Sequence, residues 1–164
     1  MAYNVLDIAR YVINYANEKG APISNLKLQK ILYYIQAKFL VEKGKSCFKE
    51  DVVNWTYGPV IEKAYNEFRE FGHRNITPQT KYEEIEYDTD TRSIKVVIKD
   101  VKDECLENND KELIKNVVEQ YCEYRPFELV KKTHEEDPWK NSKQNDVIGI
   151  DIIKEYYTNN PDKL

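Results

Sequence analysis

His73 and His134 are the only imidazoles in the chain that could serve acid–base or metal chemistry. His134 opens an HEED run, which superficially resembles the zinc-binding HExxH motif. That motif needs a second histidine four residues on, where this chain has Pro138 followed by Trp139, and the proline would also break the helix that such a site requires. The sequence therefore predicts no metal ion and no metalloprotease chemistry.

The cysteines and glycines favour neither covalent catalysis nor nucleotide binding. Cys47, Cys105 and Cys122 are odd in number, widely spaced and without a CxxC pair, which is typical of free thiols in a reducing compartment. Cys122 is expected to be a small core residue. No GxSxG, GxGxxG or GxxxxGK[ST] motif is present. We therefore expect no catalytic residue and no cofactor, and we do not expect an enzyme.

Basic residues gather in one segment, where Lys27, Lys30 and Lys38 fall near one side of a predicted helix together with Tyr34. Such a face could contact phosphates. The chain as a whole is acidic, with 29 acidic against 25 basic residues and a net charge of -4, so nucleic acid is disfavoured as a partner. We interpret this face as the exposed edge of an amphipathic helix. No apolar run approaches the ~18 residues that span a bilayer, so a cytoplasmic protein without membrane contact is expected.

Helical periodicity dominates the pattern that must position these residues. Glycines at positions 20, 44, 58 and 72 divide the first half of the chain into segments of helical length. Asn4 and Ser24 are expected to cap the first two helices, and Pro59 to open the third. The expected helices cover residues 5–18, a segment from Ser24 to Gly44, 59–72, about 109–121, a short stretch after Pro126, and a last segment after Asp151.

The periodicity changes to alternation over residues 82–99. Ile85 and Tyr87 alternate with charged residues before a polar turn, and Ile94, Val96 and Ile98 alternate after it. This pattern predicts a β-hairpin, which we expect to lie against the helices because a lone hairpin is unstable. The tail, residues 159–164, is expected to fray. The predicted fold is mainly α: a single compact domain over residues 1–164, with about six helices and one small β-hairpin.

Three motifs go beyond generic helix chemistry. They are LKLQKILYY at residues 26–34, WTYGPV at residues 55–60 followed by Tyr65 and Phe68, and Thr133-His134 with Pro138-Trp139. Their order and spacing resemble the Panacea domain family, the SocA-like antitoxins that are also described as GepA-type phage-associated proteins. The motif residues that carry the resemblance are Leu28, Leu32, Trp55, Tyr57, Gly58, Pro59, Tyr65, Phe68, His134, Pro138 and Trp139.

The resemblance implies an antitoxin of a type II toxin–antitoxin system, often phage-associated, which neutralises its cognate protein toxin by direct binding. Family members are paired with unrelated toxins, so the chemistry of the partner does not transfer. One alternative is an adaptor that delivers a bound protein to a protease. The other is a DNA-binding autorepressor, which an operator bound by the purified protein alone would support.

The motif residues divide into expected core positions and expected contacts. Leu28, Leu32 and Trp55 are expected in the core, and Gly58-Pro59 at a helix start. The predicted partner-binding residues are Gln29, Lys30, Tyr33 and Tyr34, whose polar tips lie on a helix with an already complete apolar stripe. The alternative is that these four side chains form an internal hydrogen-bond network with His134.

Overall fold

The computed structural model describes the whole chain, residues 1–164, as seven α-helices, two short 3₁₀ helices and five strands. The helices are α1 (Val5–Glu18), α2 (Asn25–Glu42), α3 (Glu62–Phe68), α4 (Asn108–Tyr121), α5 (Pro126–Glu135), α6 (Asp137–Lys140) and α7 (Ile150–Asn159), with the 3₁₀ helices η1 (Arg69–Phe71) and η2 (Pro161–Lys163). The strands are β1 (Val52–Trp55), β2 (Gly58–Val60), β3 (Lys81–Asp88), β4 (Ser93–Asp100) and β5 (Val147–Ile148).

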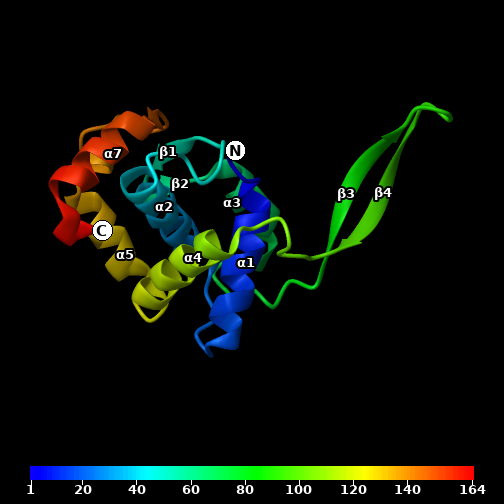
Figure 1. Ribbon diagram of the computed structural model, residues 1–164, viewed down its shortest axis with the longest axis horizontal. Helices are drawn as coiled ribbons and strands as arrows, with labels where there is room; N and C mark the ends of the chain where they lie inside the picture. Colours follow the sequence, from blue (N-terminus) through cyan, green and yellow to red (C-terminus); the bar gives the residue numbers. More distant parts are fainter.

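Helix α2 is the centre of the body, because α1, α3, α4, α5, α7 and strand β2 all pack against it (Figure 1). Fourteen of its 18 residues are buried. The prediction of one apolar stripe on this helix was therefore too narrow. A helix that is surrounded on all sides must bury its polar residues together with its apolar ones.

The first two helices begin where the sequence predicts. The Asn4 side chain accepts a hydrogen bond from the backbone N–H of Leu6 at 3.0 Å, and the Ser24 hydroxyl accepts one from Lys27 at 3.4 Å. These caps satisfy backbone donors that a helix start leaves free. Local capping chemistry therefore sets both N-termini.

The fold class differs from the mainly α prediction, because the structure is mixed, with two small sheets beside its seven helices. The unexpected sheet is antiparallel, with strand order β2-β1-β5, and pairs Val53 with Val60 and with Val147. Pro59 lies within strand β2, so the prediction that it opens a helix was wrong. Strands of two to four residues leave too little alternation in the sequence to be recognised.

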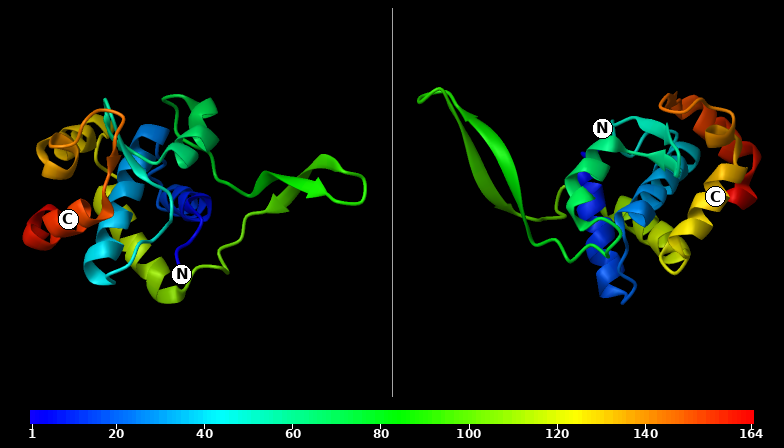
Figure 2. Two further views of the ribbon diagram at one scale, coloured as in Figure 1. Left: turned by 90° about the horizontal axis from the view of Figure 1, so that it is seen from above. Right: turned by 180° about the vertical axis from the view of Figure 1, so that it is seen from behind.

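The β3–β4 hairpin forms as predicted, with Lys81 opposite Asp100 at its base and Asp88 opposite Ser93 at its tip. Its expected packing against the helices was wrong. The hairpin projects away from the body as an arm, as the views in Figures 1 and 2 agree. We call residues 81–100 the arm.

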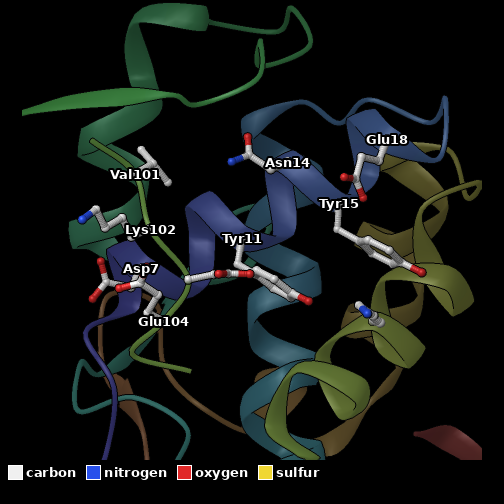
Figure 3. Close-up of a pocket in the computed structure, with 10 residues that line it drawn as sticks. Asp7, Tyr11, Asn14, Tyr15, Glu18, Val101, Lys102 and Glu104 are labelled. Carbon is white, nitrogen blue, oxygen red and sulfur yellow. The ribbon is translucent and has the colours of Figure 1, made fainter. Parts of the chain in front are cut away.

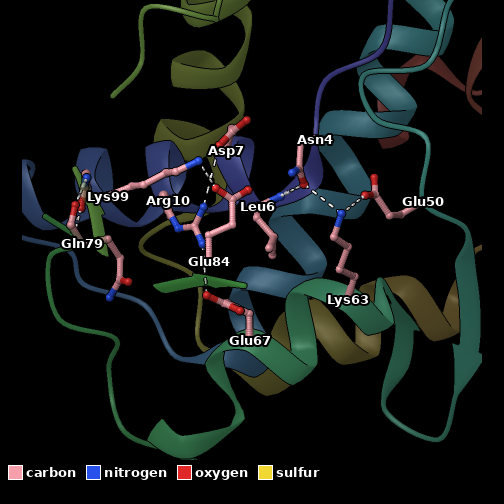
Figure 4. Close-up of polar contacts among 11 residues, drawn as sticks. Asn4, Leu6, Asp7, Arg10, Glu50, Lys63, Glu67, Gln79, Glu84 and Lys99 are labelled. Carbon is pink, nitrogen blue, oxygen red and sulfur yellow. Dashed lines mark hydrogen bonds and ion pairs between the residues drawn. The ribbon is translucent and has the colours of Figure 1, made fainter. Parts of the chain in front are cut away.

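Polar contacts fix the root of the arm to the body (Figure 4). Asn14 on α1 donates to the carbonyl of Gln79 at 2.9 Å and accepts from its N–H at 2.7 Å. Arg10 donates to Glu67 on α3 at 3.1 Å, and its guanidinium lies 3.9 Å from the ring centroid of Tyr82. The arm is therefore anchored at its base while its outer part stays free of the body.

The chain end does not hang free of the fold. Residues Pro161–Lys163, expected to fray, form η2, and the carbonyl of Lys163 accepts a hydrogen bond from Lys132. Leu164 packs against the core. Among the helices, none combines the length and the apolar character needed to cross a bilayer.

Gly58 provides the sharpest stability test of the unexpected sheet. Its φ is +109°, and an added Cβ would lie 2.6 Å from Lys30 Cε and 2.8 Å from Thr133 Oγ1. We expect Gly58→Ala to lower the free energy of unfolding by about 3 kcal/mol, from overpacking plus the strained φ. Urea denaturation measures the change.

The matched control is Gly44→Ala, because Gly44 also has a positive φ, +66°, but has open space around its Cα. It should cost only about 1 kcal/mol. Equal costs for the two substitutions would show that the close approach of Lys30 to Gly58 is not what fixes this position.

Candidate functional site

The four residues predicted to bind a partner lie inside the protein. Gln29 and Tyr33 are 1% exposed, and Lys30 and Tyr34 are fully buried. The expectation that their polar tips are exposed was wrong, because α2 is covered on every side. Their positions favour the alternative of an internal network.

That network centres on Glu136 and not on His134. The buried Glu136 carboxylate accepts hydrogen bonds from the hydroxyls of Tyr34 at 2.5 Å and Tyr157 at 3.0 Å, and from Lys132 Nζ at 2.8 Å. The hydroxyl of Tyr33 lies 3.0 Å from that of Tyr157, whose single proton is donated to Glu136, so Tyr33 is the donor in this second hydrogen bond. Burial raises the pKa of the tyrosines in this cluster, so they remain neutral donors. The network ties α2 to α5, α6 and α7.

Lys30 supports the β1–β2 turn from beneath. Its ammonium donates to the carbonyl of Pro59 at 3.1 Å, and its side chain passes directly under Gly58. Burial lowers the pKa of Lys30 to about 7, because the charged form loses its hydration. A long cationic side chain is thus used as an internal strut rather than as a contact residue.

Gln29 and Asn25 fasten the neighbouring segment. The Gln29 carbonyl oxygen accepts from the N–H of Ile61 at 3.0 Å, and its amide donates to Asn25 at 2.9 Å. Asn25 in turn donates to the carbonyl of Tyr65 at 3.0 Å. The amides of α2 therefore hold the start of α3 in place.

The basic residues considered for phosphate binding do not form an exposed face of α2. Lys27 is 6% exposed and donates to the carbonyl of Cys122, while Lys38 pairs with Glu42 at 3.0 Å. The interpretation of an exposed helix edge was wrong for Lys27 and Lys30. Cys122 is buried, as predicted.

Motif residues that do reach the surface meet around the β1–β2 turn. Tyr57 is 57% exposed and packs edge-to-face against Phe127 of α5, which is 65% exposed, with ring centroids 6.0 Å apart. Trp139 Nε1 donates to the carbonyl of Trp55 at 2.9 Å, and the Trp139 ring stacks on His134 at 3.8 Å. We call Trp55, Tyr57, Phe127, His134 and Trp139 the motif patch.

His134 takes part in the patch as a flat ring rather than as a ligand. Its plane lies 12° from that of Trp139, and its Nε2 is buried without a hydrogen-bond partner. Burial lowers the pKa of His134, which favours the neutral ring. No group of three or more His, Cys, Asp or Glu side chains is placed to hold a metal ion.

Trp55 lies at the edge of the core and not within it. It is partly exposed and packs edge-to-face on Tyr65, with centroids 4.9 Å apart. Both rings line an open cavity of about 470 Å³, which also contacts Tyr57, Arg69 and His73. By contrast, Leu28 and Leu32 are fully buried and Phe68 is 2% exposed, so the core prediction holds for the leucines and fails for Trp55.

A second cavity, of about 560 Å³, lies between α1 and the segment that follows the arm (Figure 3). Its lining is mainly polar and includes Asp7, Tyr11, Glu18 and Lys115. None of the motif residues borders it. The motif patch, rather than this cavity, is therefore the candidate site.

Two residues that matter for the site are not among those predicted from the sequence. Phe127 is one of them, and it directly follows Pro126 in the first turn of α5. The other is Glu136, an acidic residue that is only 2% exposed. Lys132 lies four residues before Glu136, and this spacing on a helix is the sequence feature that could have indicated an ion pair between the two side chains.

The buried ammonium of Lys30 gives the protein a predictable pH response. In the unfolded chain Lys30 holds its proton to about pH 10, so above pH 7 the unfolded state binds more protons and the free energy of unfolding rises with pH. Between pH 7 and 8.5 we expect a gain of up to roughly 2 kcal/mol from this group. Urea denaturation across this range should show the gain in the wild type.

Lys30→Met should remove that gain while keeping the packing of the stem. Lys27, whose pKa burial also lowers, is unchanged in both proteins, so the difference between them isolates Lys30. If the stability of the wild type and of Lys30→Met changes with pH in parallel, Lys30 keeps its proton in the folded protein over this range and its pKa is not lowered toward 7.

Tyr34 tests the internal network. Tyr34→Phe removes the hydrogen bond to Glu136 and should cost about 1–2 kcal/mol of unfolding free energy. Tyr34→Ala also leaves a cavity beside Tyr121, which stacks on Tyr34 at 4.6 Å, and should cost about 3–5 kcal/mol. Thermal and urea denaturation measure both; a Tyr34→Ala protein as stable as the wild type would mean that this side chain is not part of the core.

Comparisons with known proteins agree with the sequence motifs. The family model for "Antitoxin SocA-like, Panacea domain" matches residues 28–140. Antitoxin SocA of Caulobacter vibrioides (strain NA1000 / CB15N) is 40% identical over 72 residues, which cover 42% of this chain and only 38% of that protein. No solved structure matches the chain. Because the family match covers more than half of the chain and contains the whole motif patch, the chain belongs to the SocA-like antitoxin family with the Panacea domain.

Proposed function

We propose that the protein neutralises a cognate protein toxin by binding it directly through the motif patch. The observation that carries this proposal is the exposed aromatic pair Tyr57–Phe127, at the place where the motif segments meet. Aromatic side chains of this kind dominate the energy of protein interfaces.

The support beneath the patch also favours binding. Lys30 holds the turn through Pro59, and Trp139 holds it through the Trp55 carbonyl. A turn fixed in this way loses little conformational entropy when a partner covers it. The patch is therefore preorganised for an occluding contact.

The cavity lined by Trp55 and Tyr65 extends the proposed contact beside the aromatic pair. Arg69, Gln144 and Asn145 also line this cavity. A lining that combines aromatic with polar side chains is typical of a specific interface. One side chain of the toxin inserted here would anchor the complex.

Toxin rescue in growing cells tests the proposal. We expect Tyr57→Ala and Phe127→Ala each to weaken toxin binding by about 2 kcal/mol, which is about 30-fold, and to impair rescue. Neither side chain supports the core, so the melting temperature should change little. Calorimetric titration of the purified toxin measures the affinity.

Tyr87→Ala is the matched control, because Tyr87 is 62% exposed but lies on the arm, away from the motif patch. It should leave rescue intact. Loss of rescue in Tyr87→Ala with full rescue in Tyr57→Ala would contradict the proposed contact face.

The cellular level of the toxin distinguishes occlusion from delivery to a protease. Occlusion predicts that the toxin persists in rescued cells, as an inactive complex. Disappearance of the toxin during rescue would instead support the adaptor mechanism, with the same patch serving as the docking surface.

A further inference from the structure

The arm carries an apolar face that nothing in the chain covers. Directly opposed residues of an antiparallel pair point to the same side, so the register places five apolar side chains together: Ile85, Tyr87, Ile94, Val96 and Ile98. Each is between 60% and 72% exposed. We call these five residues the arm face.

The opposite side of the arm is chemically different. Lys99 pairs there with Glu84 and, at 3.0 Å, with Glu86, and Tyr82 lies against Arg10 at the root. One side of the ribbon is therefore adapted to water and to the body, whereas the arm face is not. A two-stranded ribbon with such a face is marginal alone in water and requires a cover.

We propose that the arm face docks onto the arm face of a second copy of this chain, forming a two-fold dimer that is independent of toxin binding. Five side chains exposed to this extent present on the order of 500 Å² of apolar surface. Two such faces together bury up to about 1,000 Å², which is the lower limit for a specific interface. The arm face reaches this limit when its partner is identical.

Charges at the two ends of the arm fit an antiparallel arrangement of two copies. Glu83 lies near the root on the same side as the arm face, and Arg92 lies at the tip, and neither forms an ion pair within the chain. Stacking two arms with their tips in opposite directions places Arg92 of each copy over Glu83 of the other. The pair Ile85/Val96 then covers the pair Tyr87/Ile94 of the second copy.

Pairing through the open edge of β3 is less favourable than this stacking. An antiparallel β3–β3 contact centred on Ile85 would place Glu84 opposite Glu86 of the second copy, and like charges directly opposed destabilise a sheet. It would also leave both arm faces in water. Face-to-face packing, with the two ribbons about 10 Å apart, removes them from water.

Sedimentation equilibrium of the purified chain, over low to high micromolar concentrations, tests the dimer. The wild type should have the mass of two chains. Ile85→Lys combined with Val96→Glu replaces the central apolar pair by an opposite-charge pair without changing the net charge, and should weaken dimerisation about 100-fold. An unchanged melting curve shows that the body stays folded.

The matched control is Glu86→Gln with Lys95→Gln, an opposed pair at the corresponding height on the other side of the ribbon. It should remain dimeric. Glu83→Arg and Arg92→Glu should each weaken the dimer a few-fold, and the two together should restore it.

Three results would overturn the proposal. The first is a wild type that is monomeric at every concentration, and the second is a dimer that persists in Ile85→Lys/Val96→Glu. The third is a wild-type antitoxin that is monomeric alone and binds the toxin, while the double variant no longer binds it. The last result would assign the arm face to the toxin. Failure of the Tyr57→Ala rescue test leaves the dimer proposal standing, because the motif patch and the arm face share no residue.

Discussion

The structure depends on the requirement that polar side chains inside the protein be hydrogen-bonded. Helix α2 is packed against other elements on all sides, so its residues Gln29, Lys30 and Gln36 have no access to water. Each of these three side chains forms a hydrogen bond with the backbone of the segments that follow α2. The Gln36 side chain accepts hydrogen bonds from the N–H groups of Cys47 and Phe48 and donates one to the Phe48 carbonyl. Lys30 donates a hydrogen bond to the Pro59 carbonyl. The polar residues of α2 thereby hold in place the loops that build the β1–β2–β5 sheet.

Local interactions explain which parts of the fold the sequence could predict. The caps Asn4 and Ser24 and the alternation in the arm act over a few residues, so the bounds of α1, α2 and the hairpin follow from the sequence. The burial of α2 does not follow, because it depends on five helices that pack from distant parts of the chain. Strand β5 has two residues and pairs with β1 nearly a hundred positions away, so it leaves no local pattern.

The same reasoning explains why the candidate site moved. Polar side chains on an amphipathic helix are expected to face water and to be available to a partner. Helix α2 is central instead, so its polar side chains are buried and form hydrogen bonds inside the protein. Most motif residues, such as Leu28, Lys30 and Gly58, therefore serve the fold. Only where the motif segments reach the surface, at Tyr57 and its neighbours, do they leave aromatic area for another molecule.

The body and the arm differ in how they are stabilised, and this separates the two exposed surfaces. Buried hydrogen bonds lie behind the motif patch, so a change at Glu136 or Lys30 alters the patch together with the stability of the core. The arm is held only at its root, by contacts such as those of Asn14 and Arg10, and its outer residues support nothing in the body. Substitutions on the arm face therefore alter what the arm binds without altering the patch. The arm face can therefore change in sequence while the motif patch is kept constant by the packing of α2.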